Sequence, residues 1–172
     1  MNNYDEALSF FMSTYTLEHT KRYSMKPVVN EESVASHSYF VALGVLIFHR
    51  VYAFNLADAL SIALVHDLPE IKISDINHKV KKSFPNLGAI IKDVELQVVR
   101  SFPSEIERSY RSYAFDEESV ESLIVHFIDA LQCSQYAQSE LSLGNSNMNE
   151  VLVNTEHRAE ILKAQLEEHK RE

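Results

Sequence analysis

The apolar residues of this sequence recur with the period of the α-helix over most of its length. Within residues 5–18 they share one helix face at positions i, i+3, i+4 and i+7: Leu8, Phe11, Met12 and Tyr15. Residues 34–51 are apolar on nearly every side, which is typical of a central helix. Residues 19–32 contain Pro27 and β-branched valines without this period, so we predict a loop there.

The next helix should begin at Asn55, because an asparagine side chain caps the free amides of a first helical turn. The apolar period continues to His66, and Pro69 should end or kink the helix. Residues 72–85 are polar and basic, which predicts a loop with a short helical turn.

Four further helices are expected, at residues 86–101, 104–113, 117–142 and 147–171. Asp116 should cap the third of these and Gly144 should end it. The last helix has a stripe that we expect to be buried: Val151, Leu152, Ile161, Leu162 and Leu166. Since no strand pattern appears, we predict a single all-α domain over residues 1–172, with about seven helices.

Composition narrows the classes of function. Only three glycines and four prolines occur among the 172 residues, which argues against a β-sandwich with many turns and against a glycine-rich phosphate loop. The net charge of −9 argues against a nucleic acid polymer or an anionic membrane as partner. With Cys133 as its single cysteine and no signal-like or membrane-spanning segment, we expect a cytoplasmic protein.

Four polar residues stand in apolar helical surroundings where packing alone would not place them: His37, the pair His66 and Asp67, and Asp129. A buried carboxylate without a cationic partner costs several kcal/mol. One divalent ion would satisfy two imidazoles and two carboxylates together, and this mixture of ligands suits Mn, Co or Zn better than Mg. A buried His–Asp hydrogen bond without metal is the simpler alternative for His66 and Asp67.

Two more acids follow this pair. Glu70 lies four residues after His66, so it shares a helix face with the pair if the turn survives Pro69. A carboxylate beside an ion site can transfer protons in hydrolysis, although a solvated acid at a helix end would look the same. Asp75 could cap the following turn.

The order His37, His66-Asp67, Asp129 is similar to the H…HD…D signature of the HD-domain phosphohydrolase superfamily. Further stretches resemble the bacterial HD-domain 5′-deoxynucleotidases: Arg22-Tyr23, residues 32–38, residues 66–70, Ser74-Asp75, residues 129–131 and residues 143–145. The resemblance covers residues 4–145 or nearly so. It implies an HD-domain helical bundle with a metal-site core at about residues 20–145 and a C-terminal helix at 147–171.

The resemblance also implies roles. His37, His66, Asp67 and Asp129 correspond to the metal ligands of the family. Glu70 takes the place of its essential acid, and Asp75 the place of a second acid near the sugar and leaving oxygen. Arg22 matches a phosphate-binding arginine, and Tyr23 stands where the family commonly has a tryptophan against the nucleoside. His126, three residues before Asp129, stands where a lysine is common.

Two enzyme functions fit this resemblance. The closer match is removal of the 5′-phosphate from deoxynucleoside monophosphates. The alternative is hydrolysis of a deoxynucleotide such as dATP with release of triphosphate, in which Lys79 and Lys81 would bind phosphates and Met25 would line the base pocket. A third hypothesis is a non-catalytic binding domain that keeps the HD fold. The apolar faces of the last two helices favour a homo-oligomer.

Overall fold

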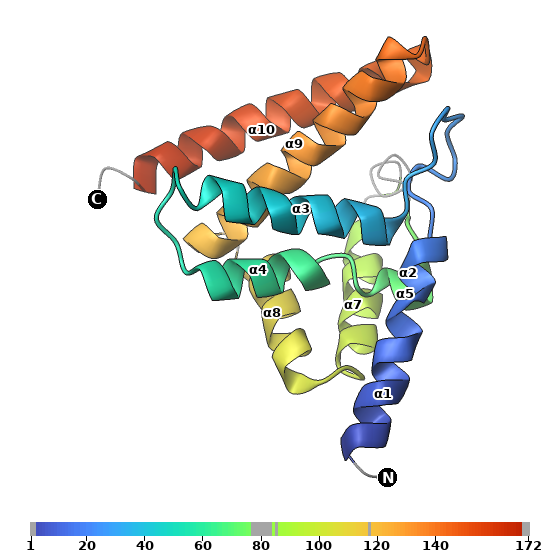
Figure 1. Ribbon diagram of the computed structural model, residues 1–172, viewed down its shortest axis with the longest axis vertical. Coiled ribbons are helices and arrows are strands. Elements are labelled where there is room, and N and C mark those ends of the chain that lie inside the picture. Colours follow the sequence, from blue (N-terminus) through green and yellow to red (C-terminus); the bar gives the residue numbers. More distant parts are fainter. Residues whose placement is uncertain (1–2, 77–83, 85, 117, 170–172) are drawn as a thin grey trace.

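The computed structural model describes residues 3–76, 84, 86–116 and 118–169. Seven long helices dominate these residues and no strand occurs among them, which confirms the all-α prediction (Figure 1). The long helices are α1 (Asn3–Thr14), α3 (Val34–Phe48), α4 (Leu56–Val65), α7 (Leu87–Val99), α8 (Ser104–Phe115), α9 (Val120–Ser142) and α10 (Asn149–His169). The short ones are α2 (Thr16–His19), α5 (Glu70–Ile73) and the 3-10 helix η1 (Ser146–Met148). No helix in this part of the chain has the length and apolar character needed to cross a bilayer.

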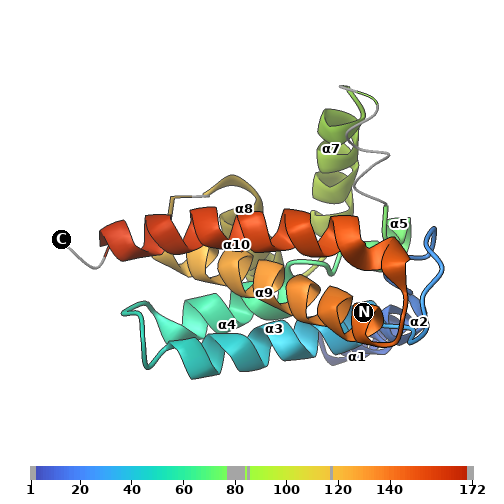
Figure 2. The same ribbon diagram turned by 90° about the horizontal axis from the view of Figure 1, so that it is seen from above.

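Helix α9 lies at the centre of the arrangement. It packs against α10 on one side and against α3 and α4 on the other (Figure 2). Eleven of its residues are buried, which is why its sequence is apolar on more than one face. The main core cluster joins its side chains to those of α3, α4 and α10, for example Ile124 with Val45, Ile62 and Leu166.

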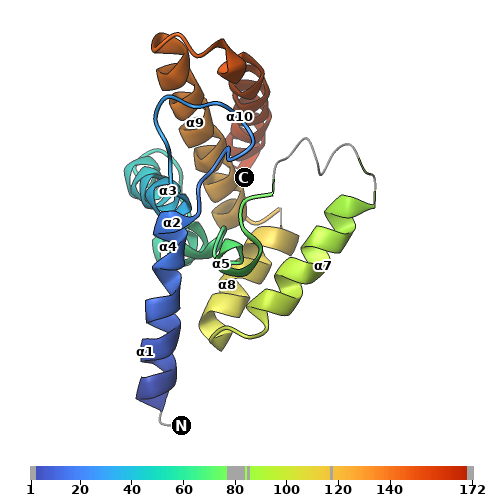
Figure 3. The ribbon, with the colours of Figure 1, turned by 90° about the vertical axis from the view of Figure 1, so that its right-hand side faces the viewer.

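A second core cluster joins α2, α3, α7 and α8 through residues that include Leu17, Val34, Val99 and Tyr110. The helix predicted at residues 5–18 is broken at Tyr15 into α1 and α2. The N-terminal end of helix α1 projects beyond the other helices (Figures 1 and 3). The apolar face predicted for this segment is exposed: Leu8, Phe11, Met12 and Tyr15.

Helix α3 differs from its prediction because only one of its sides is buried. Ser33 caps it by accepting a hydrogen bond from the amide of Ser36, and the helix ends three residues earlier than expected, at Phe48. Its inner side contributes Val41 and Val45 to the core. Its outer side exposes a row of large apolar residues: Tyr39, Phe40, Leu43, Leu46 and Ile47.

The ends of the other helices follow the predicted signals with one correction. Asn55 caps α4 by accepting from the amides of Ala57 and Asp58, and Pro69 lies between α4 and α5. The cap predicted at Asp116 is wrong. Asp116 follows the end of α8, and α9 is capped by Ser119, whose hydroxyl accepts from the amide of Ser122.

After α9 the chain reverses at Gly144, whose φ of +88° is a conformation that glycine adopts without steric cost. The reversal places α10 beside α9 (Figure 1). Of the stripe predicted to be buried, Leu166 is fully buried, whereas Ile161 is exposed.

Candidate metal centre

Three helices bring the four predicted ligands together. His37 lies one turn inside α3, His66 follows directly after α4, and Asp129 lies in the middle of α9. Asp67 follows His66 in the turn before α5. His37 and His66 are almost fully buried, so packing around them fixes where their rings point.

The distances define a compact cluster. The Nε2 atoms of His37 and His66 lie 3.1 Å apart. Oδ2 of Asp67 lies 3.5 Å from Nε2 of His37 and 3.3 Å from Nε2 of His66. Oδ1 of Asp129 lies 3.3 Å from Nε2 of His37. His37 is therefore the shared member of two groups of candidate ligands. It groups with His66 and Asp67, and also with Asp129 and Cys133, and in each group the ligand atoms lie within 4.8 Å of one another.

Hydrogen bonds on the far side of each imidazole fix its orientation. Nδ1 of His66 donates to the carbonyl oxygen of Ala63 at 2.8 Å. Nδ1 of His37 lies 2.6 Å from Oε1 of Gln132, and the amide nitrogen of Gln132 donates to Glu32, so Oε1 accepts from His37. Both rings therefore carry a proton on Nδ1 and direct Nε2 into the cluster. Outer contacts of this kind are typical of metal-binding histidines.

The charged groups of the cluster shift one another's pKa values. Burial acts to raise the pKa of Asp67, yet His66, His37 and Arg22 hold it well below its usual range. The pKa of Asp129 is also held well below its usual range, because His37 and Arg158 outweigh the effect of burial. Burial lowers the pKa of His66, but Asp67 raises it above its ordinary value. Both carboxylates are thus kept ionised, which is the state that binds a cation.

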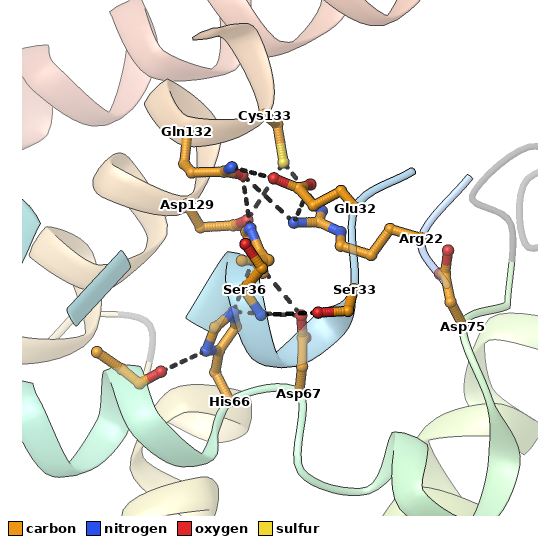
Figure 4. A network of polar contacts seen from close by, with 12 residues as sticks. Arg22, Glu32, Ser33, Ser36, His66, Asp67, Asp75, Asp129, Gln132 and Cys133 are labelled. Carbon is orange, nitrogen blue, oxygen red and sulfur yellow. Dashed lines mark hydrogen bonds and ion pairs between the residues drawn. The ribbon is translucent and has the colours of Figure 1, made fainter. Parts of the chain in front are cut away.

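Arg22 lies beside the cluster and is largely buried (Figure 4). Its Nη2 lies 3.1 Å from Sγ of Cys133, and its Nη1 lies 3.4 Å from Oε1 of Gln132 and 3.6 Å from Oε2 of Glu32. The guanidinium therefore contacts two residues of α9 and one residue of the segment before α3. Burial acts to lower the pKa of Arg22, but its positive charge lies near enough to the carboxylates of Asp67 and Asp129 for both to raise that pKa.

Tyr23 and Asp75 belong to one local arrangement on the outer side of Arg22. Tyr23 has a φ of +56°, which is uncommon for a residue other than glycine, and Oδ2 of Asp75 accepts a hydrogen bond from its amide at 3.0 Å. The ring of Tyr23 stacks on Tyr136 with centroids 5.1 Å apart. Asp75 lies apart from His66 and Asp67 (Figure 4). It positions the Tyr23 backbone and does not join the ion cluster.

Glu70 is the first residue of α5, and its amide donates to the carbonyl oxygen of Asp67. It is partly buried and lines a cavity of about 450 Å³ between α2 and α5, together with residues that include Thr20, Ser24 and Ser74. None of the four predicted ligands lines this cavity. Glu70 thus faces this cavity, and its backbone is joined to Asp67, three residues earlier.

The other residues predicted to lie in or near the site are Met25, Lys79, Lys81 and His126. Met25 is 70% exposed, and its place in a base pocket stays a prediction. Lys79 and Lys81 lie outside the described residues. His126 is half-buried, with Nε2 at 3.2 Å from the carbonyl oxygen of Tyr113 and Nδ1 accepting from Arg158.

Four residues around the cluster were not predicted to belong to it: Glu32, Gln132, Cys133 and Arg158. Gln132 and Cys133 follow Asp129 by three and four positions, so helical spacing could have placed them on its face. Sγ of Cys133 lies 3.5 Å from Oδ1 of Asp129, and Cys133 forms a group of candidate ligands with His37 and Asp129. Burial raises the pKa of its thiol to about 12, so the thiol is protonated as long as no cation binds it. Arg158 lies on α10, and no local signal in the sequence marks it.

The donor set fits a divalent transition metal. Nitrogen and oxygen ligands are mixed, both histidines present unprotonated Nε2 atoms when neutral, and both carboxylates are ionised. Such an ion would also relieve the close approach of the two Nε2 atoms, since it would take the place of the proton that one of them must otherwise carry.

Solved structures of known proteins share this fold. A conserved hypothetical protein from Pyrococcus furiosus matches with a TM-score of 0.78 and 24% identity, covering 96% of this chain and 99% of that one. A protein from Pyrococcus horikoshii matches with a TM-score of 0.75 and 25% identity, over 92% and 97%. An HD-domain phosphohydrolase from Listeria innocua matches with a TM-score of 0.73 and 24% identity, over 96% and 82%. A comparison with curated proteins gives no match.

The helical fold and the H…HD…D cluster together define an HD-domain phosphohydrolase. The model of the 5′-deoxynucleotidase YfbR-like family matches residues 9–170. The chain belongs to this family, which confirms the resemblance seen in the sequence and makes the protein a metal-dependent phosphohydrolase by class.

Proposed function

We propose that the protein removes the 5′-phosphate from deoxynucleoside monophosphates by metal-dependent hydrolysis. The observation that carries the proposal is the gathering of His66, Asp67 and Asp129 around Nε2 of His37, with Arg22 beside them. An ion with a guanidinium next to it is the arrangement that phosphate-ester hydrolysis requires. Family membership supports the nucleotide as substrate class.

In this proposal the four ligands hold a Co, Mn or Zn ion, which when bound supplies positive charge at the phosphate and lowers the pKa of water. Arg22 donates hydrogen bonds to phosphoryl oxygens, and its contacts with Glu32 and Gln132 keep the guanidinium in place. Glu70 transfers a proton to or from the attacking water or the leaving oxygen.

Asp75 acts through Tyr23 in this scheme. By accepting from the amide of Tyr23, it holds the backbone in its unusual conformation and the ring against Tyr136. We propose that the nucleoside lies near this aromatic pair. The role of Asp75 is then to position Tyr23, and a direct proton transfer is reserved for Glu70.

A panel of deoxynucleoside mono- and triphosphates, incubated with the protein and Co, Mn, Zn or Mg, tests the proposal. Release of inorganic phosphate and a deoxynucleoside from monophosphates is the expected result. Release of intact triphosphate from a substrate such as dATP would instead establish the alternative activity. Binding of nucleotides without hydrolysis under every metal would establish a non-catalytic binding domain.

We also propose that two copies of the chain associate through the exposed side of α3. The segment Val34–Phe48 carries no Asp, Glu, Lys or Arg, so two copies can meet there although each carries a net charge of −9. Contiguous exposed apolar residues typically mark interaction surfaces. Phe40, Leu46 and Ile47 form such a row on α3. Light scattering should report a dimer, and Ile47→Glu should convert it to a monomer. A monomeric wild-type protein would contradict this proposal.

A further inference from the structure

A second arginine reaches the metal centre from the C-terminal helix. Nη1 of Arg158, on α10, lies 3.3 Å from Oδ2 of Asp129, and its Nη2 lies 3.1 Å from Nδ1 of His126. Asp129 thus uses its two oxygens differently, because Oδ1 faces His37 and Oδ2 faces Arg158. One carboxylate group therefore separates the Arg158 guanidinium from the predicted ion position.

Arg158 and Arg22 differ in their access to solvent. The side chain of Arg158 is 49% exposed, whereas that of Arg22 is 13% exposed. Arg22 also has a carboxylate of its own, Glu32, at 3.6 Å. Of these two arginines, Arg158 is therefore the one whose guanidinium a molecule from solvent can reach more easily.

The formal charges of the centre point to the same residue. Asp67 and Asp129 together offset the charge of a divalent ion, and Glu32 offsets Arg22. Asp129 would be shared between the ion and Arg158, so these groups together carry one excess positive charge, and Arg158 is the more exposed of the two arginines that contribute to it. A phosphate monoester carries nearly two negative charges at neutral pH, so binding it requires a cation beyond the balanced set.

We propose that Arg158 is a second phosphate-binding residue of this centre, which binds phosphoryl oxygens of an anionic ester. The inference rests on the proposed function. A cation held in part by Asp129 would withdraw charge from that carboxylate and weaken its attraction for Arg158. The N–H groups of Arg158 can then donate to phosphate, while its contact with His126 retains the side chain at the centre.

A purely structural role for Arg158 makes a different prediction. In that case the guanidinium only orients Asp129 so that Oδ1 faces His37. Loss of an outer partner of a metal ligand typically weakens metal binding about 10- to 100-fold. It would leave the affinity of the metal-loaded protein for phosphate unchanged.

The test measures binding of inorganic phosphate by calorimetry, with the protein saturated with Co or Zn, for wild type, Arg158→Ala, Arg158→Lys and Arg50→Ala. Arg50 is an exposed arginine in the segment between α3 and α4, which makes it a matched control. Arg158→Ala should weaken phosphate binding about 10- to 100-fold, since a hydrogen bond to a charged group is lost. Arg158→Lys should restore part of the affinity, and Arg50→Ala should match wild type.

Each result decides the inference. Unchanged phosphate binding in Arg158→Ala overturns it, whether or not metal affinity falls, and so does a wild-type protein that binds no phosphate. A fall in phosphate affinity at saturating metal supports it, even if metal affinity also falls. The proposed function is judged separately, because its failure would appear as an absence of nucleotide hydrolysis by a wild-type protein that still binds phosphate through Arg158.

Discussion

The Nε2 atoms of His37 and His66 face each other at 3.1 Å. Both rings donate from Nδ1 to fixed acceptors, Gln132 and the carbonyl oxygen of Ala63, so neither ring can turn its Nε2 away without losing a buried hydrogen bond. The pair is therefore held in the orientation that suits ligation of a cation shared with Asp67 and Asp129.

Substitution of either carboxylate should remove the metal. Asp129→Ala and Asp67→Ala each leave the two imidazoles with one anionic partner instead of two, so we expect loss of bound metal after dialysis and loss of hydrolysis. Metal content by elemental analysis is the measurement, and Asp93→Ala, an exposed acid on α7, is the control. Wild-type metal content in either variant would refute the ligand assignment.

Metal binding should strengthen as pH rises. Burial lowers the pKa of His66, but Asp67 raises it above the ordinary value of about 6.5, and this proton must leave before an ion can bind. In the metal-free protein the raised pKa stabilises the folded state fully below about pH 6.5, and this stability is lost as pH rises through the folded-state pKa.

The rise in melting temperature on adding Zn should therefore be larger at pH 8 than at pH 6. Thermal unfolding with and without Zn over this range measures it. Asp67→Ala should abolish both the effect of Zn and its pH dependence. A constant increment between pH 6 and pH 8 would show that His66 gives up no proton when the metal binds.

Sequence patterns predicted the features that depend on residues close together in the sequence, such as helices and their ends. Helix periodicity, the Asn55 cap and the stop at Gly144 each rest on a few neighbouring residues, and the structure contains all three. The cap at Asp116 failed because Ser119 offers a hydroxyl three residues before the amide of Ser122, and nothing in the sequence ranked one candidate above the other.

The outer parts of the site could not be predicted in the same way. Gln132 contacts His37 across 95 positions and Arg158 reaches Asp129 from another helix, so both contacts depend on how α3, α9 and α10 pack. Periodicity also could not separate a buried apolar face from an exposed one. Phe11 on α1 and Ile47 on α3 fit the helical pattern as well as core residues do, yet both are exposed.

Glu70→Gln should separate metal binding from the chemical step. The variant keeps the shape of the side chain but cannot accept a proton, so the rate of hydrolysis should fall about 10²- to 10⁴-fold with unchanged metal content. Steady-state kinetics at saturating metal measures this, with the exposed Glu105→Gln as control. Hydrolysis at the wild-type rate would make Glu70 a helix-end acid without a chemical role.

Glu140 holds the segment that carries Arg22 against α9. Its buried carboxylate accepts from the amides of Val29 and Asn30, at 2.6 and 2.7 Å, and from the side-chain amide of Asn145. Glu140→Gln puts an NH₂ group in place of one acceptor oxygen. We expect the free energy of unfolding to fall by about 1–3 kcal/mol at pH 7.

This loss should depend on pH. Burial acts to raise the pKa of Glu140, but the amide donors lower it below its ordinary value of about 4.5. The stabilisation is therefore present above about pH 4.5 and is lost as pH falls through the folded-state pKa. Urea unfolding at pH 7 and below pH 4 measures the difference, with the exposed Glu118→Gln as control. A difference that persists in acid would mean that the charge of Glu140 is not what stabilises the loop.

Gly44 sets the distance between α3 and α9, and its replacement tests the packing that places His37 beside Asp129. A Cβ added at Gly44 would clash with Cγ2 of Ile128, whereas one added at Gly88 on α7 meets nothing within 4 Å. Gly44→Ala should lower the free energy of unfolding by about 1–3 kcal/mol, because the core is overfilled. Gly88→Ala, the control, should leave it unchanged or raise it by up to about 1 kcal/mol. Full wild-type stability of Gly44→Ala would contradict the close approach of α3 and α9.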